Sequence, residues 1–441
     1  MQTPPRQAPC SSTAPVRLEA PQTMYKRLSA LILSLALMLA VSGATWAHGD
    51  IPRTAEPSDA EARLFVADAT NGDLISLDLP TGDMVSRLST PRYIMSLALS
   101  SDEQHLFTMR GRSTYRDFIT VVNTGLDAEE GRFYPPYVAR TIPVDTPGPG
   151  WENRMLTVRG KDALMMEGTA EFVILDDNAF TGLAPISVRT FKLGAPDHYF
   201  YLEEGENLYV GHLRKGYVQV INSKTGEEVT RIEGCPLNHG KGKDEVSGRL
   251  FYACMRDVMV IGTRGDEQNQ VVGRIPYPEN QRIGAFIEGA GRILWGYTEG
   301  ILPIMYRFDP AVEPYQFEVV TLGASIRQWA TEGGKYFLSL TRGGVLQIRD
   351  GGTGELLRTA QVSKPFAKDY HEHVGRAILP DIKSMHGDAY VSLPHEGRIA
   401  VVDLETAEIK RYFDVGGEPT RIVLVEPAAA AARAAAMSAI Q

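Results

Sequence analysis

Short apolar runs alternate with turn residues along almost the whole chain between Arg63 and Val425. The runs are rich in β-branched and aromatic residues, which pack well on a pleated sheet, and the Gly, Asp and Asn residues between them favour tight turns. The span shows no sustained helical periodicity. The pattern therefore predicts an all-β fold.

One strand pattern recurs after a polar turn, and its first apolar residue marks each repeat. The eight markers are Leu64, Leu106, Leu164, Leu208, Leu250, Ile293, Tyr336 and Ala389. Most of them lie about 43 residues from the next, and about 40–45 residues is the length of one four-stranded propeller blade. The sequence predicts a β-propeller with eight blades, or with seven if one repeat is degenerate.

The two ends of the repeat predict how the ring closes. The first marker strand, Leu64–Ala67, has no inner strand before it, whereas Pro419–Val425 follows the last repeat. Pairing of these ends would complete the first blade and protect its sheet edges. Two wider intervals indicate insertions at Leu126–Gly150 and Lys364–Met385.

The N-terminal region has the pattern of a secretory signal peptide. From Met24 the chain reads MYKRLSALILSLALMLAVSGATWA, in which two basic residues precede an apolar run and small residues end at Ala47. The run is shorter than the roughly 20 apolar residues that span a bilayer. We expect cleavage near Ala47, a periplasmic mature protein and no membrane segment after cleavage.

These patterns divide the chain into five parts. They are an over-called translation start at 1–23, a signal peptide at 24–47, an N-terminal arm at 48–61, the propeller at 62–426 and an Ala-rich tail at 427–441.

Charge and cysteine content narrow the possible functions. The 45 basic and 54 acidic residues give a net charge of -9 without a basic cluster, which argues against nucleic-acid binding. Cys10 precedes the signal peptide, so Cys235 and Cys254 remain in the mature chain. Two cysteines in an oxidising compartment most simply form a disulfide, with thiolate metal ligation as the alternative.

Histidine placement supplies the candidate chemistry, because the motifs of covalent haem, phosphate loops, serine hydrolases and zinc proteases do not occur. His198 and His239 each lie about ten residues before a marker, where an inner strand is expected to begin. The inner strands of a propeller surround its axial channel. Two imidazoles in adjacent blades could share a metal ion there, although hydrogen bonding to a neighbouring loop is the simpler role for either one.

Further ligands can be sought in the second insertion. His371 and His373 are two positions apart, so an extended backbone would turn only one of them inward. This insertion belongs to a blade opposite His198 and must fold over the channel mouth to reach it. Three imidazoles completed by Asp197, Glu372 or water suit zinc, and copper would also bind such nitrogens. His48 could add its imidazole and α-amine as the first mature residue.

Four segments resemble the periplasmic zinc metallochaperones of the AztD type. They are GAPDHYF at Gly194–Phe200, GCPLNHG at Gly234–Gly240, FYAC at Phe251–Cys254 and KDYHEH at Lys368–His373. That family consists of secreted β-propellers that pass zinc to the solute-binding protein of a zinc-import ABC transporter. The resemblance extends from about Arg63 to Val425.

The resemblance implies roles for particular residues. It makes His198, His239 and His371 zinc ligands, with His373 as a substitute for the last, and it places a Cys235–Cys254 bridge beside the site. The chain departs from the family where Trp151-Glu152-Asn153 stands in place of an expected histidine, so that Glu152 could complete the site. It also offers only His48 at a mature N-terminus that is often His-rich in the family.

The sequence therefore favours a non-enzymatic periplasmic zinc carrier. Two other interpretations remain open at this point. One is a propeller subunit of an enzyme like the periplasmic amine dehydrogenases, which would need a cofactor-bearing partner. The other is an interaction scaffold that binds no metal.

Overall fold

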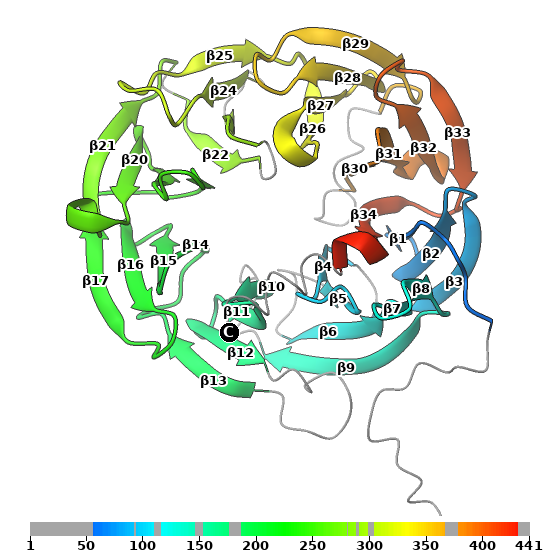
Figure 1. Ribbon diagram of the computed structural model, residues 1–441, viewed down its shortest axis with the longest axis horizontal. Helices are drawn as coiled ribbons and strands as arrows, with labels where there is room; N and C mark the ends of the chain where they lie inside the picture. Colours follow the sequence, from blue (N-terminus) through cyan, green and yellow to red (C-terminus); the bar gives the residue numbers. More distant parts are fainter. Residues whose placement is uncertain are drawn as a thin grey trace, which may run out of the picture. The chain divides into compact units, whose positions relative to one another are not determined.

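The structure is a computed structural model that describes residues 56–91, 94–109, 116–145, 153–175, 187–279, 281–287, 291–298, 304–366 and 378–430. These residues form eight four-stranded antiparallel sheets, which are the blades of a β-propeller. Figure 1 shows the sheets around a ring, with β14, β22 and β26 nearer its centre than β17, β25 and β29. The predicted all-β, eight-bladed propeller is confirmed.

The blades are named here in chain order, each from its inner to its outer strand. Blade 1 consists of β34 (Pro419–Val425), β1 (Ala62–Asp68), β2 (Asp73–Leu79) and β3 (Asp83–Ser89), and blade 2 of β4 (Ser96–Leu99), β5 (His105–Met109), β6 (Arg116–Asn123) and β9 (Tyr137–Asp145). Blade 3 consists of β10 (Asn153–Val158), β11 (Lys161–Met166), β12 (Glu171–Leu175) and β13 (Ser187–Lys192), and blade 4 of β14 (Tyr199–Glu204), β15 (Asn207–His212), β16 (Tyr217–Asn222) and β17 (Glu228–Glu233).

Blades 5 to 8 follow the same order. Blade 5 consists of β18 (Lys241–Lys243), β19 (Leu250–Ala253), β20 (Asp257–Gly262) and β21 (Gln270–Pro276), and blade 6 of β22 (Ile283–Phe286), β23 (Leu294–Thr298), β24 (Ile304–Phe308) and β25 (Glu318–Thr321). Blade 7 consists of β26 (Ser325–Ala330), β27 (Tyr336–Thr341), β28 (Val345–Asp350) and β29 (Leu356–Gln361), and blade 8 of β30 (Ile382–Met385), β31 (Asp388–Leu393), β32 (Arg398–Asp403) and β33 (Ile409–Asp414). Short 3-10 turns occur at Gly265–Glu267, Glu332–Gly334 and Pro394–Glu396.

The marker strands are the second strands of their blades, and the ring closes as expected. Seven markers lie within these strands, and Ile293 directly precedes β23. Strand β34 pairs antiparallel with β1, with Leu64 opposite Leu424. The C-terminal strand therefore completes blade 1, so the edge of β1 is covered by hydrogen bonding.

The first predicted insertion carries a small hairpin between β6 and β9. Its strands are β7 (Leu126–Asp127) and β8 (Arg132–Phe133), and Leu126 and Phe133 are buried. The buried Arg63 of β1 donates to the carbonyl of Tyr134 at 2.5 Å and lies 4.6 Å from the centre of the Phe133 ring. The insertion therefore packs against blade 1.

Both predicted insertions include a strand of a blade, and the first of them, Leu126–Gly150, contains the outer strand β9. The insertion that was expected to end at Met385 includes β30, so the inner strand of blade 8 begins within it. Its central part, 367–377, lies outside the described residues. The tail begins with helical residues at 427–430, and Ala430 is buried against the core of blades 1 and 2.

Apolar side chains fill the spaces between neighbouring blades. One cluster joins blades 7 and 8, with Leu338, Leu340 and Val391 fully buried in it. Burial of such a side chain stabilises the fold by about 1.5–3 kcal/mol. The described residues contain no helix with the length and apolar character needed to traverse a bilayer.

Candidate metal centre

His198 and His239 lie together at the inner side of adjacent blades. His198 directly precedes β14, and His239 lies shortly before β18. Their ring centroids are 5.4 Å apart and the rings are inclined by 35°. Two imidazoles on one tetrahedral zinc ion have centroids about 5 Å apart, because each Zn–N bond is about 2.0–2.1 Å long. The separation of the two rings therefore fits a shared ion.

A contact with the next blade determines which ring nitrogen of His239 carries the proton. Its Nδ1 lies 2.7 Å from the carbonyl oxygen of Gly284 in β22. A carbonyl oxygen can only accept, so Nδ1 donates and the neutral ring carries its lone pair on Nε2. This arrangement is the usual one for an imidazole that binds metal through Nε2.

A contact with the preceding blade likewise determines the orientation of the His198 ring and which of its nitrogens carries the proton. Its Nδ1 lies 2.5 Å from the Oε1 of Glu167, whose side chain is fully buried directly after β11. A carboxylate that accepts from Nδ1 leaves the lone pair on Nε2 and makes that nitrogen a stronger ligand. Glu167 therefore orients the imidazole of His198 for metal binding.

Glu167 is not among the site residues predicted from the sequence, although the sequence contains one signal for it. This signal is an acidic residue directly after the apolar run ALMM, and in the structure its side chain is fully buried. A buried carboxylate requires a charged or hydrogen-bonding partner. Its position in the repeat could not show that this partner is the imidazole of His198 in the next blade.

Arg154 of β10 places a positive charge beside His198. Its Nη2 is 3.2 Å from Nε2 and 3.4 Å from Nδ1 of that ring, and 3.7 Å from the Oε1 of Glu167. A donor on the lone-pair axis of Nε2 would be much farther from Nδ1 than from Nε2. The nearly equal distances place the guanidinium beside the ring and off the axis along which a metal ion would approach.

Phe200 of β14 forms an apolar contact with both imidazoles. Its ring centroid is 4.8 Å from that of His198 and 5.0 Å from that of His239. An aromatic ring in this position restricts the rotation of both histidines. The pair is therefore held by polar contacts at Nδ1 and by packing on one side.

The carboxylate of Asp197 accepts hydrogen bonds from backbone N–H groups around His198. Its buried carboxylate accepts from the backbone N–H of His198 at 2.8 Å, of Arg214 at 2.9 Å and of Lys215 at 3.0 Å. Both carboxylate oxygens take part in these bonds. These contacts fix the loop that carries His198, and the role of Asp197 as a metal ligand stays a prediction.

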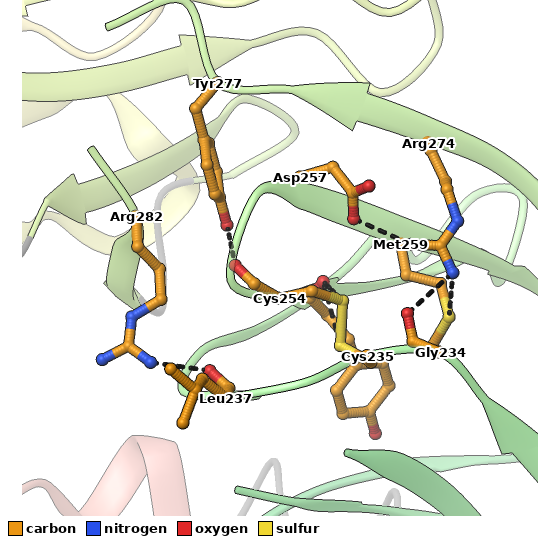
Figure 2. Close-up of a disulfide and its surroundings, with 10 residues drawn as sticks. Gly234, Cys235, Leu237, Cys254, Asp257, Met259, Arg274, Tyr277 and Arg282 are labelled. Atoms are coloured by element: carbon orange, nitrogen blue, oxygen red, sulfur yellow. Dashed lines mark hydrogen bonds and ion pairs between the residues drawn. A yellow bond between two sulfur atoms is a disulfide. The ribbon is translucent and has the colours of Figure 1, made fainter. Parts of the chain in front are cut away.

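A disulfide anchors the loop that carries His239. Cys235 and Cys254 are bonded, with their Cα atoms 4.8 Å apart, as the sequence predicted. Figure 2 shows this bridge and the side chain of Arg282, which donates to the carbonyl of Leu237 at 2.7 Å. The bonded sulfurs cannot serve as thiolate ligands. The bridge instead restricts the backbone just before His239.

The remaining expected ligands cannot be placed. Glu152, His48, His371 and His373 all lie outside the described residues. Within the part of the chain that the structure describes, no group of three or more His, Cys, Asp or Glu residues could hold a metal ion. The described site therefore offers two imidazole donors and the carboxylate that supports one of them.

A second histidine of blade 4, His212, has a different environment from that of His198. His212 ends β15, is fully buried, and its Nε2 lies 3.1 Å from the Oε1 of Gln219. Burial lowers the pKa of His212 to about 4, and the bond to Gln219 only partly opposes this. His212 is therefore a neutral residue of the blade core.

Comparison with known proteins identifies relatives by fold. No family model matches the chain, and no curated protein matches it. Apo AztD from Citrobacter koseri is 20% identical over 83% of this chain and 98% of its own, with a TM-score of 0.67. A second structure of Citrobacter koseri AztD is 19% identical over 82% of this chain and 97% of its own, with a TM-score of 0.65.

An enzyme shares the architecture at lower identity. The dihydro-heme d1 dehydrogenase NirN, in complex with DHE, is 11% identical over 84% of this chain and 76% of its own, with a TM-score of 0.60. Identities of this size show a common fold and do not transfer a function. The chain thus has a propeller fold similar to that of AztD.

Proposed function

We propose that this protein is a periplasmic zinc chaperone that carries one zinc ion at His198 and His239 and delivers it to the solute-binding protein of a zinc ABC importer. The main support is the matched orientation of two imidazoles in adjacent blades. Each donates from Nδ1 to an oxygen of a neighbouring blade, so both keep an Nε2 lone pair.

Zinc is the metal that the sequence resemblance to AztD-type chaperones favours. Imidazole nitrogens also bind divalent copper tightly, so the donor type alone does not select between the two metals. The fold similarity to AztD does not by itself specify a metal. It agrees with the resemblance of the sequence segments to zinc chaperones of that type. Metal content after periplasmic expression is the direct check.

We infer that a third donor comes from His371 or His373, with Glu152 and His48 as further candidates. Two imidazoles leave a tetrahedral zinc ion two positions short, and those positions must be filled by other residues or by water. A donor that can leave would open the site to the ligands of a receiving protein. Delivery by ligand exchange requires such an incomplete or reversible coordination shell.

The mature protein is proposed to act in the periplasm. The signal-peptide pattern before Ala47 indicates export, and a disulfide between Cys235 and Cys254 is typical of an oxidising compartment. The carrier needs no chemical step, because its cargo is bound and released without bond changes other than coordination. No enzymatic activity is therefore proposed.

The test is a two-protein transfer assay with the mature chain purified from the periplasm. The zinc-loaded protein is mixed with the apo solute-binding protein, with and without a competing chelator. Direct delivery predicts that the acceptor fills faster than zinc dissociates into the chelator, and that His371→Ala/His373→Ala slows filling. If filling and spontaneous dissociation occur at the same rate, the chaperone assignment fails. His386→Ala, at an exposed residue, is the matched control.

A further inference from the structure

An exposed apolar patch lies on the two loops that the disulfide joins, close to the histidine pair. Leu237 and Met255 are 43% and 49% exposed, and Pro236 is exposed as well. The backbone N–H of Met255 donates to the carbonyl of Pro236 at 2.8 Å, so the two loops lie side by side. Figure 2 shows Leu237 on the same loop as Cys235. These three exposed residues are called the apolar patch below.

The backbone of Leu237 is strained. Its φ angle is +52°, in the left-handed region where the Cβ atom comes too close to the following carbonyl oxygen. The Cys235–Cys254 bridge and the hydrogen bond from Arg282 to the Leu237 carbonyl restrain this loop. Such strain is concentrated at functional sites. A partner that covers Leu237 would supply the burial that this chain alone does not.

The backbone connects the apolar patch to both histidines. His239 follows Leu237 by two residues in the same loop. The turn at 213–216 accepts a hydrogen bond from the N–H of Cys235 at 2.8 Å and donates one to the carbonyl of His198 at 3.1 Å. A protein that covers the patch would therefore lie next to the two imidazoles.

Two cationic side chains flank the apolar patch. Lys215 belongs to the turn at 213–216, Arg256 directly follows Met255, and both are exposed. In the described ranges of the chain, neither side chain has an ion-pair or hydrogen-bond partner. The neighbouring carboxylate of Asp257 is already paired with Arg274 at 2.9 Å. In a chain of net charge -9, these cations favour a partner with acidic residues.

We propose that the apolar patch, with Lys215 and Arg256 beside it, is the docking surface for the zinc-receiving protein. That protein would cover the patch with an apolar side chain and place Asp or Glu residues against the two cations. An apolar centre within a polar rim is the usual anatomy of a protein interface. The inference rests on the proposed function, because a receiving protein must approach the histidine pair for its ligands to reach the ion.

The test measures docking directly, with the full mature chain immobilised and the apo solute-binding protein as the probe. Biolayer interferometry should show saturable binding to the parent. Leu237→Gly should weaken binding about tenfold, because it removes the side chain at the centre of the patch. Glycine adopts a positive φ without strain, so the thermal unfolding temperature of this variant should not fall. Val246→Ser, at an apolar residue 79% exposed in the β18–β19 loop, is the matched control.

The charged part of the surface has its own readout. Lys215→Gln/Arg256→Gln should lower the association rate several-fold at low ionic strength, and the difference should disappear at high salt. Arg189→Gln, at an exposed arginine, is the control for loss of charge. Chelator competition should give the parent's zinc affinity in all these variants. If Leu237→Gly lowers zinc affinity, Met255→Gln on the other loop decides the outcome.

Three results would overturn the docking surface. They are no saturable binding by the parent, equal binding by the parent and the patch variants, and self-association of the parent that Leu237→Gly abolishes, which would make a second copy the occupant. Binding that the variants weaken, without transfer faster than spontaneous dissociation, would refute delivery and keep the docking surface. Parent-like binding by the variants together with direct transfer would keep the carrier and refute this surface.

Discussion

His198 and His212 belong to the same blade and are both close to Tyr199, yet their imidazoles have different hydrogen-bond partners. Tyr199 pairs with His212 across β14 and β15, and their rings lie 5.0 Å apart. His212 is sealed in the blade with a neutral partner, Gln219, whereas His198 contacts a buried carboxylate, Glu167. A carboxylate at Nδ1 strengthens Nε2 as a metal ligand, whereas His212 is buried in the blade core beside a neutral amide. The comparison therefore leads us to expect metal binding at His198 and not at His212.

The largest effect on zinc binding is expected from removal of the imidazoles of His198 and His239. We expect each of His198→Ala and His239→Ala to lower zinc affinity at least about tenfold, and the double variant at least about a hundredfold, because each loses a coordination bond. Chelator-competition titration measures the effect. His212→Gln should bind zinc like the parent. Parent-like affinity in the double variant would show that zinc does not bind at this pair.

The second prediction uses pH to isolate His212. Its pKa of about 4 in the folded protein lies below the ordinary value of 6.5, so the unfolded chain binds the extra proton between these values. The stabilisation is therefore complete above pH 6.5 and is lost as the pH falls toward 4. We expect this residue to remove about 2 kcal/mol of unfolding free energy between pH 7 and pH 5.

Urea unfolding at the two pH values measures that loss. His212→Gln has no imidazole to protonate at this position, so its stability should depend less steeply on pH than that of the parent. Equal pH dependence in the two proteins would contradict the assignment of His212 as a buried neutral residue.

The third prediction concerns the effect of the Glu167 carboxylate on zinc affinity. Glu167→Gln keeps the shape of the side chain but removes the negative charge that supports the imidazole of His198. Loss of such a partner typically lowers metal affinity by about 10–100-fold, and we expect about tenfold here. The matched control is Glu171→Gln in the same blade, where the carboxylate pairs with Lys192. Equal zinc affinity in Glu167→Gln and the control would reduce Glu167 to a packing role.

The sequence predicted those features that recur or that have few alternatives. The markers and the Pro419–Val425 strand specified the propeller and its closure, because a regular spacing of strands is a property of the chain itself. Cys235 and Cys254 could be paired because they are the two cysteines after the predicted signal peptide. His198 and His239 could be placed together because they occupy matched positions in consecutive repeats.

The contacts between blades could not be predicted in the same way. Glu167 and Arg154 reach His198 from blade 3, and the direction of a side chain at the end of a strand depends on how neighbouring blades pack. Asp197 is adjacent to His198 in sequence, but its carboxylate turns toward backbone amides. The sequence therefore could not show that the carboxylate that contacts this imidazole is that of Glu167 in the preceding blade.

The smallest expected effect concerns Arg154, which lies beside His198 without lying on the Nε2 axis. Its charge repels a bound cation, and two unit charges a few ångströms apart in water interact by about 1 kcal/mol. An interaction of this size corresponds to about fivefold in an equilibrium constant, so we expect Arg154→Gln to raise zinc affinity about fivefold. Arg189→Gln, at an exposed arginine of the same blade, is the control.

Stopped-flow release into a chelator should show that the gain in Arg154→Gln comes from slower dissociation, because removal of a nearby repulsive charge stabilises the bound ion. The same variant distinguishes two roles of the guanidinium. If Arg154 served mainly to hold Glu167 and the imidazole in place, its loss would lower zinc affinity in parallel with Glu167→Gln. A lower zinc affinity in Arg154→Gln would therefore show that Arg154 mainly holds Glu167 and His198 in place. It would contradict the prediction that the charge of Arg154 promotes zinc release.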